Sequence, residues 1–401
     1  MIRILFTTEH REQHYTIQAV NMLSGLNEFD GVQIDFFDTD YQKYDVILFM
    51  GYDPRVLEAR ASNPRSRIGV IDPRSVTEDV VNADFIVAQG IEEMNWASDY
   101  VFDICRYDIY PIPHGRLKTH VDKKNIIIGY HGNKIHLQTM FPHLSTAIEA
   151  LAEHYHVEFW AMYNIQGLGE LPFDPFPGGK VKYRPIQWEW DGFERYFTHV
   201  DIGVIPNLLP IYHLPQARKN IESFPTLFYE QDTDYLLRFK CTSNIARLYP
   251  FVILGIPVVA DFFPSACHTI QNGITGFIGG STGMWYRGLV QLTASATLRQ
   301  EIADRMYQQY LQTATPVVFN RNLLRFLKKI VARPPQTIPS VVTTASKRLD
   351  DLVEVNAKFL ASQNDLVKVN AKSKNKKIKS LQRILTFPAR VKRKLLSSIK
   401  K

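Results

Sequence analysis

The residues best suited to hold a phosphate group lie at the start of the segment 240–278. Lys240 is followed closely by Ser243 and Asn244, residue types that cap helices, and apolar residues then recur at helical spacing as far as Leu254. The positive end of a helix and a nearby ammonium group both favour an anion. The pattern therefore predicts a helix that begins near Ser243 and presents a phosphate site. A capped helix of an ordinary protein core is the alternative.

The residues that follow this helix indicate where the site would lie. Gly255 and Pro257 end the helix, and Val258–Ala260 read as a short buried strand. Open parallel α/β sheets bind their ligands at the carboxyl edge of the strands. We therefore expect the phosphate site at the carboxyl edge of a parallel sheet.

A second candidate loop follows the apolar strand Ile126–Ile128. Gly132 and Asn133 come after this strand and precede a helix expected from about Leu137. Glycine allows the backbone to approach a ligand closely, so this loop is a further candidate for binding. Arg184, at the end of a later strand, is a second-choice partner for a phosphate.

Three ordered segments resemble GT-B glycosyltransferases, especially the group-1 (GT4-like) branch. They are YDIYPIPHG at 107–115, DIGVIP at 201–206, and the run from GIPVVA to NGITGF at 255–277. The resemblance implies an α/β fold with two Rossmann-like domains that face each other across a crevice. It also implies transfer of a sugar from a nucleotide-diphosphate sugar to a glycan or lipid-linked acceptor, as in cell-surface polysaccharide assembly. Neither a cofactor nor a divalent metal ion is implied.

The resemblance, together with the residue types, gives a set of candidate donor-binding residues. They are Gly132, Asn133, Arg184, Lys240, Ser243, Asn244 and His268. Retaining members of this branch usually carry two glutamates eight residues apart, but here His268 stands at the second position and Cys241 or Thr242 near the first. Because that carboxylate pair is missing, a catalytically inactive GT-B-like scaffold or a nucleotide-sensing assembly protein is the alternative function.

A general base for an inverting reaction would come from the loops of the first domain. His10, Asp72 and Glu92 each follow a predicted strand, and each side chain can accept a proton. No spacing rule selects one of the three, and a salt bridge or a helix cap is the alternative role for each. The first loop has no G-x-G-x-x-G, which argues against a dinucleotide site there.

The length of 401 residues predicts two domains with additional segments. We expect an N-terminal acceptor domain at 1–115 and a nucleotide-sugar domain at 116–333, which two amphipathic helices complete. In the first domain, apolar runs predict strands at Ile2–Phe6, Val32–Phe37, Val46–Met50, Ile68–Ile71 and Phe85–Val87.

An internal repeat follows the second domain. DLVEVNAK at 351–358 recurs as DLVKVNAK at 365–372, an offset of two heptads. This spacing predicts a helical, coiled-coil-like stalk over 340–372 that could self-associate.

Positive charge is concentrated at the end of the chain. Twelve of the 47 Lys and Arg residues fall in 372–401, which has no Asp or Glu, so the remaining chain has 35 basic against 40 acidic residues. The amphipathic tail 373–401 predicts binding to an anionic membrane surface. A disordered basic tail and RNA binding are the alternatives, although the acidic body makes nucleic acid an unfavoured partner.

Cysteine use and hydropathy suggest the compartment. The three cysteines have no disulfide or metal spacing, the chain begins with a strand and not with a signal peptide, and no run is long enough to span a membrane. We therefore expect a cytoplasmic protein that is peripheral on the inner membrane face.

Overall fold

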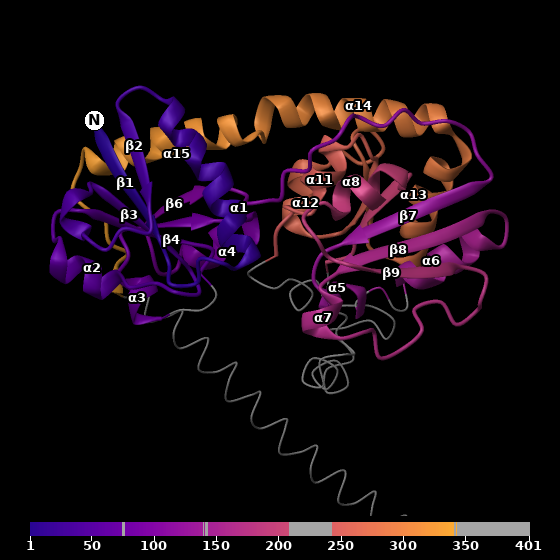
Figure 1. The fold of residues 1–401 in the computed structure, drawn as a ribbon, viewed down its shortest axis with the longest axis horizontal. Coiled ribbons are helices and arrows are strands. Elements are labelled where there is room, and N and C mark those ends of the chain that lie inside the picture. Colours follow the sequence, from indigo (N-terminus) through magenta and orange to yellow (C-terminus); the bar gives the residue numbers. More distant parts are fainter. Residues whose placement is uncertain (74–76, 139, 141–142, 208–242, 341, 343–401) are drawn as a thin grey trace, which may run out of the picture. The chain divides into compact units, whose positions relative to one another are not determined.

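The computed structural model of the chain describes residues 1–73, 77–138, 140, 143–207, 243–340 and 342 (Figure 1). Lys240 and the tail 373–401 lie outside the described residues, as does nearly all of the predicted stalk 340–372. The described residues of both sheets belong to the same unit of the chain, Met1–Ile211 with Thr233–Ser340.

Residues 2–106 form a six-stranded parallel sheet in the order β2-β1-β3-β4-β5-β6. Its strands are β1 Ile2–Thr7, β2 Val32–Phe36, β3 Val46–Met50, β4 Arg67–Ile71, β5 Phe85–Ala88 and β6 Asp103–Arg106. The five predicted strands are confirmed. The edge strand β6 was not predicted, because its sequence DICR alternates buried and half-buried residues and gives no continuous apolar run.

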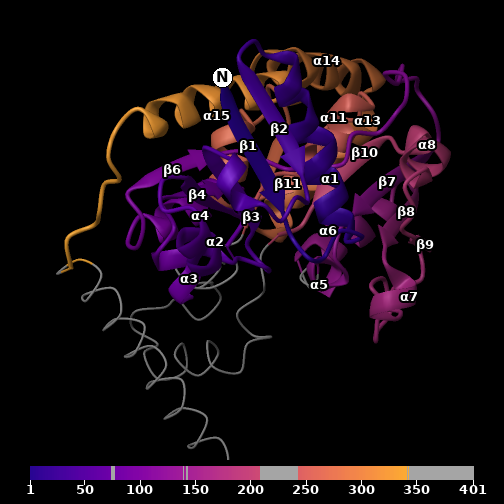
Figure 2. The same cartoon turned by 60° about the vertical axis from the view of Figure 1, so that its left-hand side comes forward.

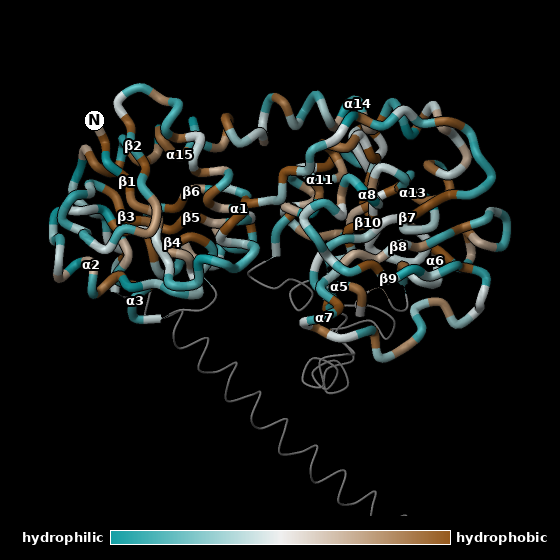
Figure 3. Tube along the Cα trace, in the orientation of Figure 1, coloured by the Kyte–Doolittle hydropathy of each residue, from teal (hydrophilic) through white to brown (hydrophobic). Residues whose placement is uncertain are grey.

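A second six-stranded parallel sheet has the order β12-β11-β10-β7-β8-β9. Its strands are β7 Asn125–His131, β8 His156–Tyr163, β9 Lys182–Gln187, β10 Ile202–Ile205, β11 Val258–Asp261 and β12 Phe277–Gly279. Most of the central strands are apolar and buried on both faces, as parallel strands covered by helices must be. Figure 3 shows that the hydrophobic stretches follow the strands of both sheets.

Helices connect the parallel strands, since a parallel pair requires a crossover. Around the first sheet they are α1 His14–Leu23, α2 Val56–Ser62, α3 Glu78–Val81 and α4 Ile91–Ala97, with the 3₁₀ turns η1 Ser24–Glu28 and η2 Tyr41–Lys43. The second sheet carries α5 Lys134–Gln138, α6 His143–Ala152, α7 Ile165–Leu168, α8 Gly192–Tyr196, η3 Phe197–His199, α11 Leu248–Ile253, α12 Pro264–Thr269 and α13 Thr282–Ala294. Two long helices follow, α14 Ala296–Thr313 and α15 Pro316–Val331.

The long helices at the end of the described chain begin where the sequence provides caps. The hydroxyl of Ser295 accepts from the amide of Leu298 at 3.1 Å at the start of α14, and Thr315 accepts from Val318 at 3.3 Å at the start of α15. Pro316 at the first position of α15 needs no partner for an amide hydrogen. Both predicted amphipathic helices are therefore present.

Helix α15 packs against the first sheet and not the second (Figures 1 and 2). The buried amide of Asn320 accepts from the hydroxyl of Tyr107 at 2.7 Å and donates to the carbonyl of Met22 at 2.8 Å. The predicted second domain, 116–333, includes this helix, whereas these contacts place it with the first sheet. The amphipathic pattern shows that the helix has an apolar face, but not which sheet covers that face.

A buried ionic contact fixes the segment that leaves the first sheet. Arg106 donates two hydrogen bonds to the carboxylate of Asp108, at 2.9 and 2.7 Å, and the hydroxyl of Tyr249 donates to the same carboxylate at 2.7 Å. Tyr249 belongs to α11, so this carboxylate connects the segment after β6 with a helix that covers the second sheet.

No helix among the described residues is both long and apolar enough to cross a membrane.

Candidate functional site

A cationic cradle forms at the carboxyl edge of the second sheet. The guanidinium of Arg247, which comes directly before α11, donates to the carbonyl of Pro206 at 2.7 Å and to the side-chain oxygen of Asn207 at 2.5 Å. Pro206 and Asn207 follow β10, and the guanidinium lies 5.9 Å from the ring centre of Tyr130 near the end of β7. Two neighbouring strand ends therefore hold one arginine in place.

The loop after β7 requires glycine where it meets this arginine. Gly132 has φ +141°, and a Cβ atom there would lie 2.8 Å from Cδ of Arg247 and 2.8 Å from the hydroxyl of Tyr130. That hydroxyl donates to the carbonyl of Asn133 at 2.7 Å. The predicted glycine loop and the segment before α11 are thus brought together, as the sequence suggested.

Burial shapes the electrostatics of the cradle. Desolvation lowers the pKa of Arg247, while the neighbouring Tyr130 and Asp261 act in the opposite direction. An arginine retains its proton at neutral pH even after such a shift. The cradle therefore holds a fixed positive charge, and the nearest buried carboxylate, Asp261, already accepts from the amides of Asn207 at 3.4 Å and Phe262 at 3.0 Å.

Two buried polar atoms, one shortly before α11 and one directly after β10, have no hydrogen-bond partner among the described residues. They are the hydroxyl of Ser243, whose residue is 1% exposed, and the side-chain nitrogen of Asn207, whose residue is 3% exposed. Leaving such a group unpaired costs about 1–3 kcal/mol. A ligand with several acceptor oxygens, such as a diphosphate, would satisfy the free donors that the cradle presents.

The start of α11 differs from the sequence prediction. The helix begins at Leu248, later than the predicted start near Ser243, and the oxygen of the Asn244 side chain accepts from the amide of Ala246 at 3.2 Å in a local turn. Asparagine competes with helical hydrogen bonds in this way. Ser243 and Asn244 therefore do not cap the helix, although its end at Gly255, with φ +70°, is as predicted.

Two predicted donor-binding residues are not joined to the cradle by any contact among the described residues. Arg184 lies on the edge strand β9, where its guanidinium stacks over the rings of Trp160 at 4.5 Å and Tyr196 at 5.3 Å. Arg184 is exposed, and β8 lies between its strand and β7. His268 is exposed in the last turn of α12.

The three candidate bases all follow strands of the first sheet but lie in different surroundings. His10 is exposed after β1, and its ring centre lies 5.6 Å from that of Tyr52. Asp72 is buried after β4 in the left-handed region, with φ +52°, and its amide donates to Val87 at 3.0 Å. Residues other than glycine adopt this conformation rarely and at a cost, often near functional sites.

Glu92 is fully engaged with the second half of the chain. Its carboxylate accepts from the amide of Ser265 at 3.1 Å and from the Ser265 hydroxyl, which in turn accepts from the amide of Ile91 at 2.9 Å. These bonds join the first turn of α4 to the start of α12. The helix cap that was the alternative role for Glu92 therefore fits this geometry better than a free base.

Sequence reasoning missed Arg247 and Asn207. Arg247 was taken as part of the predicted helix, and Asn207 was not named as a candidate. A polar residue directly after a buried parallel strand is the signal that would have identified Asn207.

His131, at the end of β7, is a buried residue. Its ring lies among Phe193, Phe197 and Phe251, and Nε2 is 2.8 Å from the carbonyl of Arg247. Burial lowers the pKa of His131 to about 3.

Comparison with known proteins identifies the fold. No protein-family model and no curated protein matches the chain. Sucrose-phosphate synthase from Thermosynechococcus elongatus is similar with a TM-score of 0.53 at 10% identity, covering 83% of this chain and 100% of that one. Anabaena HepE in complex with UDP gives 0.49 at 10% identity, with 82% and 100% covered, and T4 phage BGT in complex with UDP and Mn²⁺ gives 0.47 at 12%, with 81% and 99% covered.

At these identities the likeness concerns the fold. Two parallel six-stranded sheets, each covered by helices, match the architecture predicted from the sequence. The chain therefore has the GT-B fold.

Proposed function

We propose that the chain is a glycosyltransferase, which moves a sugar from a nucleotide-diphosphate sugar to a glycan or lipid-linked acceptor. The observation that supports this function best is the cradle at the carboxyl edge of the second sheet. It combines the half-buried cation of Arg247 with an unpaired donor on Asn207, and the unpaired hydroxyl of Ser243 lies four residues before the arginine in the chain. Lys240, outside the described residues, is proposed to add a second positive charge.

The cradle suits the chemistry of the donor. In the reaction the acceptor oxygen forms a bond to the anomeric carbon, the bond from that carbon to the diphosphate oxygen breaks, and its electron pair leaves with the diphosphate. Negative charge therefore develops on the leaving oxygen, and fixed donors directed there lower the barrier. Arg247 provides such a donor, while the glycine at position 132 leaves room for the phosphates beside it. No cofactor is needed for this step.

We propose His10 as the group that accepts the proton of the acceptor hydroxyl. Among the three candidate bases, His10 is the exposed one, whereas Asp72 is buried and the Glu92 carboxylate is bonded to Ser265. The strained backbone of Asp72 gives it a positioning role in the loop after β4.

The cellular setting is proposed from the sequence. The amphipathic basic tail 373–401 would bring the enzyme to an anionic membrane surface, where lipid-linked acceptors of polysaccharide assembly are found. Co-sedimentation of the full chain with anionic vesicles tests this setting, and removal of 373–401 is expected to abolish it.

A turnover assay tests the enzymatic function. The purified chain is incubated with UDP-, GDP-, ADP- and CMP-linked sugars and a mixture of saccharide acceptors, and the acceptor-dependent release of nucleotide is measured beside His10→Gln. We expect one diphosphate donor to be turned over, and the variant to lose about 10²-fold or more, the usual contribution of a general base. CMP-sugars lack the diphosphate and are the negative control.

Nucleotide binding without turnover of any donor would contradict the transferase. That result would favour the catalytically inactive scaffold, for which the missing glutamate pair is the specific observation.

A further inference from the structure

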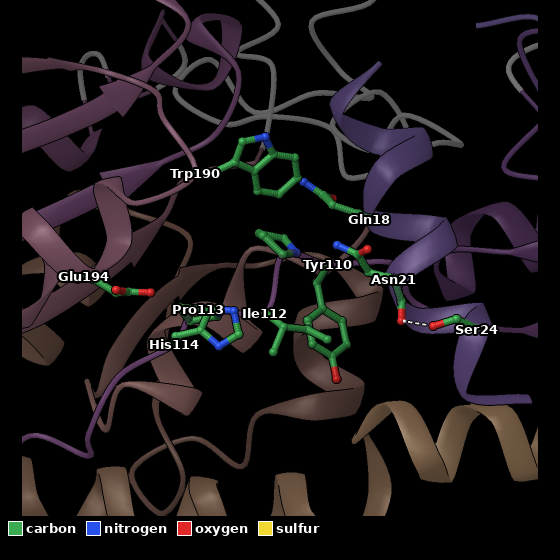
Figure 4. A pocket seen from close by; sticks show the side chains of 10 residues that line it. Gln18, Asn21, Ser24, Tyr110, Ile112, Pro113, His114, Trp190 and Glu194 are labelled. Carbon is green, nitrogen blue, oxygen red and sulfur yellow. Dashed lines mark hydrogen bonds between the residues drawn. The ribbon is translucent and has the colours of Figure 1, made fainter. Parts of the chain in front are cut away.

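A pocket of about 440 Å³ opens beside helix α1, and Arg247 is not among the residues that line it (Figure 4). Its walls come from three segments: one face of α1, the crossover after β6, and the residues after β9. The lining residues are Gln18, Asn21, Ser24, Tyr110, Pro111, Ile112, Pro113, His114, Trp190 and Glu194. The volume lies in the range of ~300–1,000 Å³ that is usual for small-molecule sites.

An aromatic platform forms one wall of the pocket. The ring of Trp190 is held edge-on by Trp188 at 4.9 Å and by His14 at 5.7 Å, and the residue is still 43% exposed. His14 in turn lies 4.2 Å from Trp188. A large apolar ring that is fixed in orientation but only partly covered offers a flat surface to a ligand.

Polar side chains stand on two sides of this platform. Figure 4 shows Gln18 and Asn21 projecting from α1 on one side, and His114 and Glu194 on the other. None of these four side chains has a hydrogen-bond or ion-pair partner among the described residues. The pocket therefore offers amide, imidazole and carboxylate groups that are free to bond a ligand.

The charge near the pocket disfavours an anionic ligand. Glu194 supplies a carboxylate, and the neighbouring cation of Arg195 is already paired with Asp191 at 2.9 Å and with Glu189. An anionic ligand would meet the carboxylate of Glu194 without a free cation of α8 to offset it. A sugar ring has apolar C–H faces and hydroxyls around its rim, which matches an indole platform flanked by amides and a carboxylate.

We propose that this pocket binds an uncharged sugar ring of the acceptor, with Trp190 stacking on the ring and Gln18 and Glu194 bonding its hydroxyls. Calling the sugar an acceptor rests on the proposed function; the binding of a neutral saccharide does not. The pocket is lined by elements of both sheets, because α1 follows β1 of the first sheet and Trp190 follows β9 of the second.

Saturation-transfer difference NMR on the full chain tests the proposal. The probes are maltose, cellobiose, lactose and methyl N-acetylglucosaminide, with glucuronic acid as the charged comparison. We expect at least one neutral saccharide to give a signal that falls ten-fold or more in Trp190→Ala and in Gln18→Ala. Phe102→Ala, which removes a ring 52% exposed elsewhere on the surface, is the matched control and should leave the signal unchanged.

Nucleotide affinity distinguishes a failure of the saccharide pocket from a failure of the proposed transferase function. Trp190→Ala should bind nucleoside diphosphates as the wild type does, because Trp190 has no contact with Arg247. Saccharide binding that depends on Trp190 would stand even if no nucleotide bound. Absence of a neutral-saccharide signal, an equal signal in Trp190→Ala, or a stronger response to glucuronic acid would each overturn the inference.

Discussion

The carboxyl edges of the two sheets arrange their polar residues differently. In the loops after β1 and β3 of the first sheet, polar side chains bond to each other: the Thr8 hydroxyl donates to Asp53 at 2.9 Å, and Arg55 lies 3.4 Å from Glu9. At the second sheet the half-buried Arg247 bonds Asn207, and the buried side chains of Asn207 and Ser243 each carry a polar group that has no partner among the described residues.

This difference separates two tasks. Loops whose polar groups are already paired keep a fixed shape and leave exposed groups such as His10 to meet a substrate. A half-buried cation near unpaired donors is instead arranged for an anion that brings its own acceptors. We infer that the second edge binds the donor phosphates, whereas the first edge forms a shaped wall for the acceptor.

The largest predicted effect comes from adding a methyl group to the loop after β7, at the carboxyl edge of the second sheet. Gly132→Ala places a methyl group 2.8 Å from Arg247 and strains a backbone at φ +141°. We expect a loss of about 2–3 kcal/mol in the free energy of unfolding and a marked loss of nucleoside diphosphate affinity. Chemical denaturation and calorimetric titration measure the two quantities.

Gly179→Ala is the matched control for that variant. Gly179 also has a positive φ, +70°, but a Cβ atom there would meet nothing within 4 Å. It should be destabilised by about 1–2 kcal/mol with unchanged nucleotide affinity. Equal affinities in both variants would show that the loop at Gly132 does not border the ligand.

The next effect concerns acid stability. Burial lowers the pKa of His131 to about 3, from an ordinary value of 6.5, so the unfolded chain binds a proton that the folded chain does not. The stability from this residue is fully present above about pH 6.5 and is lost as the pH falls toward 3. At pH 5 the loss is about 2 kcal/mol.

His131→Phe should therefore make the free energy of unfolding less dependent on pH between 6.5 and 4. Urea unfolding at several pH values measures this dependence, and His156→Gln, which removes an exposed histidine on β8, is the control. A variant as acid-sensitive as the wild type would show that another group is responsible.

The smallest predicted effect concerns the hydrogen bonds between Glu92 of α4 and Ser265 of α12. Glu92→Gln and Ser265→Ala each remove part of one hydrogen-bonded group, so each should cost about 1–2 kcal/mol of stability. Both variants should keep turnover within about five-fold of the wild type, since neither residue is proposed to transfer a proton. A hundred-fold loss confined to Glu92→Gln would instead make Glu92 the base and His10 a bystander.

Much of the fold could be predicted because it depends on local patterns. Runs such as VILFM in β3 are continuous and apolar, and Gly255 ends α11 where its spacing indicated. The position of the candidate site at the carboxyl ends of β7 and β10 followed from the rule that open parallel sheets bind their ligands at this edge. The sheet that covers α15 could not be predicted, because the choice depends on long-range partners such as Asn320 and Met22.

The candidate site was predicted in position but only partly in residues. Gly132 was named and does lie against Arg247, whereas this central cation was itself counted as part of a predicted helix. Local competition explains the error: the Asn244 side chain bonds Ala246, delays the helix, and frees Arg247 to reach across to β10. Arg184 was named for its place at a strand end, but it stacks on Trp160.

The central claim is that Arg247 binds the diphosphate of a nucleotide donor. Isothermal titration of UDP, GDP and ADP into the wild type, Arg247→Gln and Arg299→Gln tests it most directly. Arg299 is the matched control, because its buried guanidinium likewise donates to carbonyls, those of Leu292 at 2.6 Å and Val121 at 2.9 Å. The account predicts that one nucleotide binds the wild type and Arg299→Gln, but binds Arg247→Gln at least about 30-fold more weakly. Equal affinities in the two variants, or no binding to the wild type, would contradict it.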